Sequence, residues 1–169
     1  QHLVIPGDEK TSGGNGLTIG VYIYHNAPQE RLHEHIVSRL VAGRRDVWID
    51  LASSGFIHAG VRAAGQEDEV NPAPFDAVTS RERIKEARWL HVVSSYDGDF
   101  VSLYIDGRRI SVVPAPGRLD NNADRFVIGA QNPRGGVVSF TGIVDDVAIW
   151  NRALSEVEVI GLHAALERR

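Results

Sequence analysis

The chain has 169 residues, of which 43% are hydrophobic and 24% charged, and its formal net charge is −4 at pH 7. This composition is typical of a globular protein, and the acidic balance argues against nucleic acid and anionic membranes as partners. No apolar run approaches the length of a membrane span, so no span is expected. Cysteine is absent, which excludes disulfides and thiolate chemistry.

The length favours a single domain over residues 1–169, and no linker or internal repeat interrupts it. Methionine is absent, including at position 1. We therefore interpret the sequence as a domain from a larger protein, in which neighbouring domains are also partners.

Short alternating apolar runs, separated by turn residues, predict strands throughout the first half of the chain. The expected strands cover residues 1–6, 17–24, 36–41, 47–51 and 56–61, and the expected loops cover 8–16, 25–35 and 63–74. The segment 75–84 is ambiguous. The pairs Arg44-Arg45 and Arg108-Arg109 are assigned to turns.

The stretch from Trp89 to Gly107 gives the strongest local signal. Two strand-like runs flank Asp97-Gly98, a dipeptide that tolerates the positive φ angles of a tight primed turn. Asp106-Gly107 predicts a second turn of the same chemistry, followed by a strand over 109–113. Three strands joined by two tight turns predict an antiparallel meander.

The end of the chain combines further strands with one helix. Strands are expected over 125–130, 137–140 and 143–150. Ser155 and Glu158 then form a capping-box pattern, followed by apolar residues at helical spacing. This predicts a helix over 155–167. So many short strands with one helix predict an all-β sandwich or barrel.

Two stretches resemble the laminin G-like domains of the concanavalin A-like lectin/glucanase superfamily. The first runs from Trp89-Leu90-His91-Val92-Val93 to Leu103-Tyr104-Ile105-Asp106-Gly107, and the second from Phe126-Val127-Ile128-Gly129 through Phe140-Thr141-Gly142 to Ala153-Leu154-Ser155. The resemblance implies a jelly-roll β-sandwich of two antiparallel sheets with one short C-terminal helix. It also implies a secreted or cell-surface location, and binding rather than catalysis.

The chain departs from the family pattern in two respects. The strand and Asp-Gly element that usually precede the position of 3–6 are missing or shortened. The loops over 25–35 and 63–74 look lengthened, and their role is left open; loops often carry specificity.

An enzyme of this fold would need two carboxylates facing one groove, spaced as acid-apolar-acid on a strand. The glucanase relatives carry the run Glu-apolar-Asp-apolar-Glu, and no such run occurs here. Glu67-Asp68-Glu69 is contiguous and is interpreted as a solvated loop. We therefore expect a protein without catalytic activity.

Asp145 and Asp146 are the candidate metal ligands, because adjacent carboxylates can supply oxygen ligands to a structural calcium ion. Alternatively, one aspartate caps or bulges the strand and the other pairs with an arginine such as Arg152. The spacing of His33 and His35 would place both imidazoles on one strand face, as zinc requires, but a surface loop is the preferred interpretation.

Three aromatic residues are the candidate ligand-binding residues: Tyr22, Tyr24 and Trp48. Aromatic faces suit the apolar faces of sugars, and the alternation of 17–24 points both tyrosines outward. Trp89, Trp150 and His91 lie in the family motifs and are expected to be scaffold. The predicted function is a recognition or accessory module that binds a glycan or a protein surface. The alternatives are a glycan-active enzyme of the same fold and a purely structural spacer.

Overall fold

The computed structural model describes residues 2–8, 11, 14–25, 33–41, 44–64, 76–81, 83–84, 88–120, 125–131 and 138–168. The acidic run Glu67-Asp68-Glu69 lies outside these residues, as do most of the two long predicted loops.

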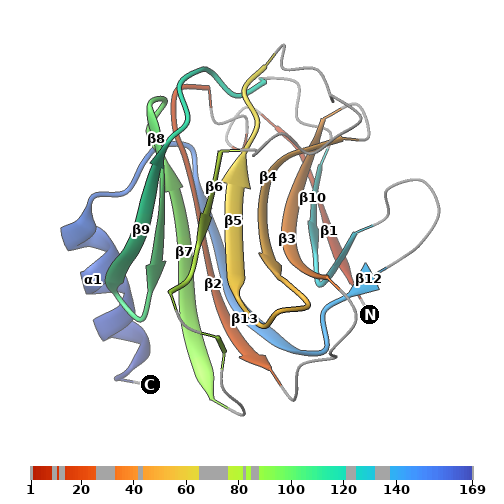
Figure 1. Ribbon diagram of the computed structural model, residues 1–169, viewed down its shortest axis with the longest axis vertical. Coiled ribbons are helices and arrows are strands. Elements are labelled where there is room, and N and C mark those ends of the chain that lie inside the picture. Colours follow the sequence, from red (N-terminus) through yellow and green to blue (C-terminus); the bar gives the residue numbers. More distant parts are fainter. Residues whose placement is uncertain are drawn as a thin grey trace.

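The described strands form two sheets that face each other (Figure 1). The eight-stranded sheet has the order β1 (Leu3–Pro6), β10 (Arg125–Ile128), β3 (Glu34–Val41), β4 (Arg44–Leu51), β5 (Ile57–Val61) and β6 (Asp76–Thr79), with β11 (Ala130–Gln131) and β12 (Val138–Ser139) beside β3. The five-stranded sheet has the order β13 (Gly142–Trp150), β2 (Leu17–His25), β7 (Trp89–Tyr96), β8 (Phe100–Ile105) and β9 (Arg108–Pro114).

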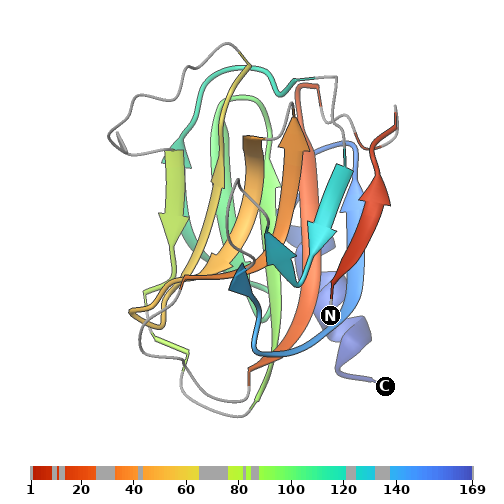
Figure 2. The ribbon, with the colours of Figure 1, turned by 90° about the vertical axis from the view of Figure 1, so that its right-hand side faces the viewer.

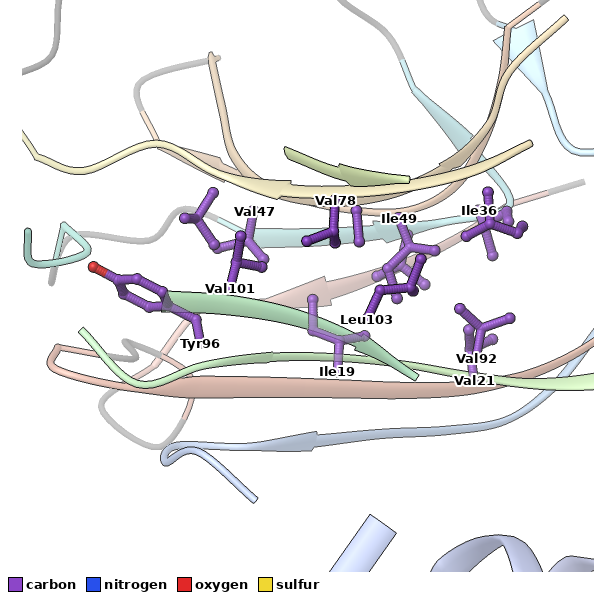
Figure 3. Close-up of a cluster of buried hydrophobic side chains, with 14 of the residues drawn as sticks. Ile19, Val21, Ile36, Val47, Ile49, Val78, Val92, Tyr96, Val101 and Leu103 are labelled. Carbon is purple, nitrogen blue, oxygen red and sulfur yellow. The ribbon is translucent and has the colours of Figure 1, made fainter. Parts of the chain in front are cut away.

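The core lies between the sheets and is built by strands that alternate apolar and polar side chains. Ile19, Val21, Val92 and Leu103 project from the five-stranded sheet and are fully buried or nearly so. They meet a second set from the eight-stranded sheet, which consists of Ile36, Val47, Ile49 and Val78 (Figure 3). Because the ladders along both main sheet orders are antiparallel, the predicted all-β jelly-roll sandwich is confirmed.

Both predicted turns of the meander are present, but they differ in geometry. Asp106 and Gly107 have φ angles of 50° and 74°, as a primed two-residue turn requires. In the first hairpin only Gly98 has a positive φ angle, of 100°. Asp97 keeps ordinary backbone geometry, and its carboxylate accepts hydrogen bonds from the amides of Asp99 and Phe100. Its contribution to the turn is therefore made by the side chain.

The helix α1 (Glu156–Leu166) is capped by Ser155, whose side chain accepts from the amide of Glu158 in the predicted capping box. It lies on the outer side of the five-stranded sheet (Figure 1), where Val159 is fully buried against a small second apolar cluster. No helix in the described part of the chain is long and apolar enough to cross a membrane.

Several strands begin earlier or end later than predicted. His25 still belongs to β2, Glu34 and His35 already belong to β3, and each of the arginine pairs assigned to turns opens a strand. Antiparallel pairing explains the difference: His25 pairs with Gly142, and Leu40 pairs with Arg45 beyond a register shift. Charged residues extend these strands because residues of the neighbouring strands are available for backbone pairing.

Arg39 and Asp46 form a buried ion pair at the end of the sandwich where residues 11 and 120 lie. The side chain of Arg39 is fully buried, and its Nε donates to both Asp46 carboxylate oxygens at 2.9 and 3.1 Å. Its Nη1 and Nη2 donate to the carbonyls of Thr11 and Asp120, at 3.1 and 2.8 Å. Arg39 therefore ties β3 and β4 to two segments that are distant in sequence.

Candidate functional site

The outer face of the eight-stranded sheet carries a group of polar side chains on β3, β4 and β5. Val47, Ile49 and Leu51 of β4 face the core, so the alternating side chains of Trp48 and Asp50 face outward. The pairing of the strands then places His35 and His58 on either side of Asp50. Figure 2 looks onto this face of the sheet, and α1 lies behind the sandwich in that view.

Asp50 is the centre of this group. Its side chain is fully buried, and its carboxylate lies 2.8 Å from His35 Nδ1, 3.2 Å from His33 Nε2 and 2.5 Å from Arg45 Nη1. Burial alone would raise the pKa of Asp50, but the hydrogen bonds of the two histidines and the charge of Arg45 outweigh it and hold the pKa far below its usual range. We call Asp50, Arg45, His33, His35 and His58 the Asp50 cluster.

Trp48 forms the floor on which Arg45 lies. The guanidinium carbon of Arg45 is 5.1 Å from the centroid of the indole, a cation–π distance. Only 6% of Trp48 is exposed, because its other side packs on Gly60. Trp48 therefore faces outward, but it is buried, and Arg45 covers part of its ring.

Replacing Gly60 with alanine is expected to lower the free energy of unfolding by about 1–3 kcal/mol, the usual effect of overpacking. A Cβ at this position would lie 2.3 Å from Cζ2 of Trp48, so the indole would have to leave its place. Denaturant unfolding and tryptophan fluorescence would measure the change. Gly161→Ala is the matched control: nothing lies within 4 Å of its Cβ position in the helix, so stability should rise by about 0.5–1 kcal/mol. A Gly60→Ala protein as stable as the wild type would contradict the packing described.

The outer part of the Asp50 cluster is accessible to solvent. The side chains of His33 and Arg45 are 45% and 27% exposed, and His58 is half-buried with its ring edge-on to His33 at 5.8 Å. Burial, and then the neighbouring His33, lower the pKa of His58. The cluster therefore presents N–H groups at the surface, while the Asp50 carboxylate is bonded to His33, His35 and Arg45.

The predicted residues Tyr22 and Tyr24 lie on the opposite side of the molecule, on the outer face of the five-stranded sheet. Trp89 packs with both, stacked on Tyr22 at 4.8 Å and tilted against Tyr24 at 5.6 Å. The stack turns the ring face of Tyr22 toward Trp89 rather than toward solvent. Since Trp48 lies on the other sheet, the three predicted binding residues do not form one site; their role in binding stays a prediction.

Asp145 and Asp146 lie at a register shift in β13, where Asp146 has a φ angle of 46° and its amide donates to the Asp145 carboxylate. One aspartate therefore bulges the strand, as the alternative interpretation expected. Arg152, the example given for the arginine partner, binds the Glu158 carboxylate at 2.6 Å. Within the described residues no group of three or more acidic or histidine side chains is placed to hold a metal ion. Calcium at these aspartates stays a prediction.

Two further histidines, one buried and one partly buried, lie between the five-stranded sheet and α1. His91 is 4% exposed and stacks on His163 of the helix, with ring centroids 5.8 Å apart. Burial, and then His163, lower the pKa of His91 to about 4. The expected scaffold role of His91 agrees with this position. Two surface hollows lie away from the Asp50 cluster. One, of about 380 Å³, is lined by residues 14–16 and 151–153, and the other, of about 410 Å³, lies beside α1.

Comparison with protein families identifies the fold. Residues 1–160 match the family model described as the concanavalin A-like lectin/glucanases superfamily. The chain belongs to this superfamily. The predicted resemblance is thereby confirmed over nearly the whole length, including the first half of the chain, where the motifs were weaker. No curated protein sequence matches the chain.

Solved structures of this superfamily fold align at low identity, which shows the fold alone. A protein from Bacteroides ovatus that is described as carbohydrate-binding aligns with a TM-score of 0.67 and 18% identity. The alignment covers 94% of this chain and 44% of that protein. Domain 4 of an arabinanase from Geobacillus stearothermophilus, in complex with arabinotriose, aligns with a TM-score of 0.61 and 19% identity. The alignment covers 89% of this chain and 67% of that one. A Trypanosoma rangeli sialidase mutant aligns with a TM-score of 0.64 and 15% identity. The alignment covers 90% of this chain and 23% of the sialidase. The chain thus spans less than half of two of these relatives.

Proposed function

We propose that this chain is a non-catalytic glycan-recognition module that binds sugar through the Asp50 cluster. The observation that carries the proposal is the arrangement of Arg45, His33 and His58, whose polar groups reach the surface of a rigid sheet while Asp50 holds two of them in place. Sugar hydroxyls are recognised by such fixed, directional donors. The carbohydrate-binding and arabinotriose-bound relatives support this class of ligand.

The chemistry of the cluster favours binding over catalysis. Glycoside hydrolysis uses two carboxyl groups, one of which must be protonated to act as an acid. The cluster has a single carboxylate, Asp50, which is fully buried and has its pKa held far below the usual range. Asp50 is therefore suited to orient Arg45 and the histidines rather than to transfer a proton.

A glycan array probed with the folded chain tests the proposal. We expect binding to a restricted set of glycans, and an Arg45→Gln variant should bind the best of them at least about tenfold more weakly, the loss of a charge-assisted hydrogen bond. Arg108→Gln is the matched control, because Arg108 is exposed on β9 of the other sheet. Melting curves establish that both variants fold. An empty array, or equal binding by Arg45→Gln and the wild type, would overturn the proposal.

A further inference from the structure

A hollow of about 380 Å³ lies at the end of the sandwich where β7 turns into β8 and where β13 leads to α1 (Figure 1). Three segments that are distant in sequence line it: residues 14–16, Asp97 and residues 151–153. The Asp50 cluster, on the outer face of the eight-stranded sheet, contributes none of these residues. The hollow is therefore a second place at which the chain can hold a ligand.

The walls of this hollow are fixed to one another and to the sheet. The hydroxyl of the buried Thr18 accepts from the amide of Leu154 and donates to the carbonyl of Arg152, each at 2.9 Å, which fixes the segment before α1. Gly16 approaches this segment so closely that a Cβ would lie 3.0 Å from the backbone nitrogen of Ala153. A ligand would therefore meet a surface that is already formed, and its binding would cost little ordering of the protein.

Asp97 brings a carboxylate oxygen that the turn does not use. Its Oδ1 accepts from the amides of Asp99 and Phe100, at 3.0 and 2.7 Å, and so holds the turn. Within the described part of the chain, its Oδ2 takes part in no hydrogen bond or ion pair. Because the side chain is exposed, Oδ2 is available to accept hydrogen bonds from a ligand in the hollow.

The charges that line the hollow favour a neutral ligand. Arg152 is bound to Glu158 at 2.6 Å, so the charges of these two cancel and that of Asp97 remains. A carboxylate disfavours an anion and accepts strong hydrogen bonds from hydroxyl groups. Calcium is not suited either, because it takes about six to eight oxygen ligands and this lining offers one carboxylate beside a guanidinium. The amides of Asn15 and Asn151, which also line the hollow, are of a kind that both donates and accepts.

We propose that this hollow binds one neutral sugar residue, with Oδ2 of Asp97 accepting hydrogen bonds from the sugar hydroxyls. Its volume lies near the lower end of the range of small-molecule sites, about 300–1,000 Å³, which suits a single sugar better than a chain. None of the described residues that line it is aromatic, so the sugar is held by hydrogen bonds without stacking. The inference adds a second sugar site to the proposed glycan-binding function and rests on residues outside the Asp50 cluster.

Titrations followed by NMR of the backbone amides test this inference. The neutral probes are methyl glucoside, methyl galactoside, methyl mannoside and arabinose, and the charged comparisons are methyl glucuronide and calcium chloride. We expect at least one neutral sugar to shift the amide signals of Gly14, Gly16 and Ala153, and both charged probes to leave them in place. No shift of these signals with any neutral sugar, or shifts with a charged probe alone, would overturn the inference.

Asp97→Asn is the decisive variant, because asparagine keeps the Oδ1 acceptor that holds the turn and replaces Oδ2 with a donor. It should keep the melting curve of the wild type and bind the neutral sugar at least about tenfold more weakly, the loss of a hydrogen bond to a charged group. Asp99→Asn is the matched control: it removes the same charge two residues away, from a side chain that does not line the hollow. Equal affinity of Asp97→Asn and the wild type would overturn the inference.

Arg45→Gln separates this inference from the proposed function. The variant should leave the titration of the hollow unchanged, because Arg45 does not line it. A hollow that binds no sugar, beside a glycan array that depends on Arg45, would overturn the inference and leave the proposed function standing. An array that does not depend on Arg45, beside a hollow whose binding depends on Asp97, would overturn the proposed function and leave the inference standing.

Discussion

Replacing Asp46 with alanine is expected to lower the free energy of unfolding by about 3–5 kcal/mol, the effect of removing one partner from a buried ion pair. The guanidinium of Arg39 would stay fully buried without the Asp46 carboxylate. Equilibrium unfolding in denaturant would measure the loss. The magnitude is large because the positive charge has been removed from water, and neutral backbone carbonyls such as those of Thr11 and Asp120 cannot neutralise it.

A double-mutant cycle with Arg39→Met separates the charge from the packing. Burial raises the pKa of Asp46 above its ordinary value even though Arg39 and Arg62 lower it, so desolvation is not fully offset. The double variant should therefore lose clearly less stability than the sum of the two single variants. Additive losses, or an Asp46→Ala protein within about 1 kcal/mol of the wild type, would show that the pair does not act as described.

Acidification from pH 6.5 to pH 4 is expected to reduce the free energy of unfolding by up to about 3 kcal/mol through His91 alone. The folded protein holds the pKa of His91 at about 4, below the ordinary value of 6.5. In this window the unfolded chain binds a proton that the folded chain does not, so stability falls as the pH falls. Below pH 4 both states are protonated at this position and its contribution changes no further.

The variant His91→Gln isolates this effect from other titrating groups. It should lose part of its stability at neutral pH through altered packing, but the slope of stability against pH between 4 and 6.5 should become flatter than in the wild type. Asp50 cannot account for the same slope, because its pKa lies below its ordinary value of 3.8 and its contribution is lost only at more acidic pH. Equal slopes in the variant and the wild type would contradict the assignment to His91.

Much of the fold could be predicted from local patterns. The meander over 89–113 and the helix near 155–167 follow from turn chemistry and capping, which depend on neighbouring residues only. The extension of strands over Glu34 and Arg45 could not be predicted in this way. It depends on partner strands that are distant in sequence, and for Arg45 also on an ion pair with Asp50 further along the same strand.

The candidate site was harder to predict than the fold. Trp48 was selected from the sequence, but its neighbours Asp50 and Arg45 were not, and His58 received no role. The alternation that points Trp48 outward also points Asp50 outward, so this part of the signal was available. The contact between His33 and His58 could not be predicted, because it depends on the register between three strands and on the path of the chain before β3.

The order of strands in the five-stranded sheet also bears on how the protein is made. β2 lies between β7 and β13, although β13 is encoded close to the end of the chain. At the usual rates of translation β13 follows β2 from the ribosome after roughly 6–25 s. During that interval one edge of β2 has no strand to pair with, and exposed edges are templates for aggregation. Chaperones that bind nascent chains should therefore improve the yield of folded protein when they are added during synthesis.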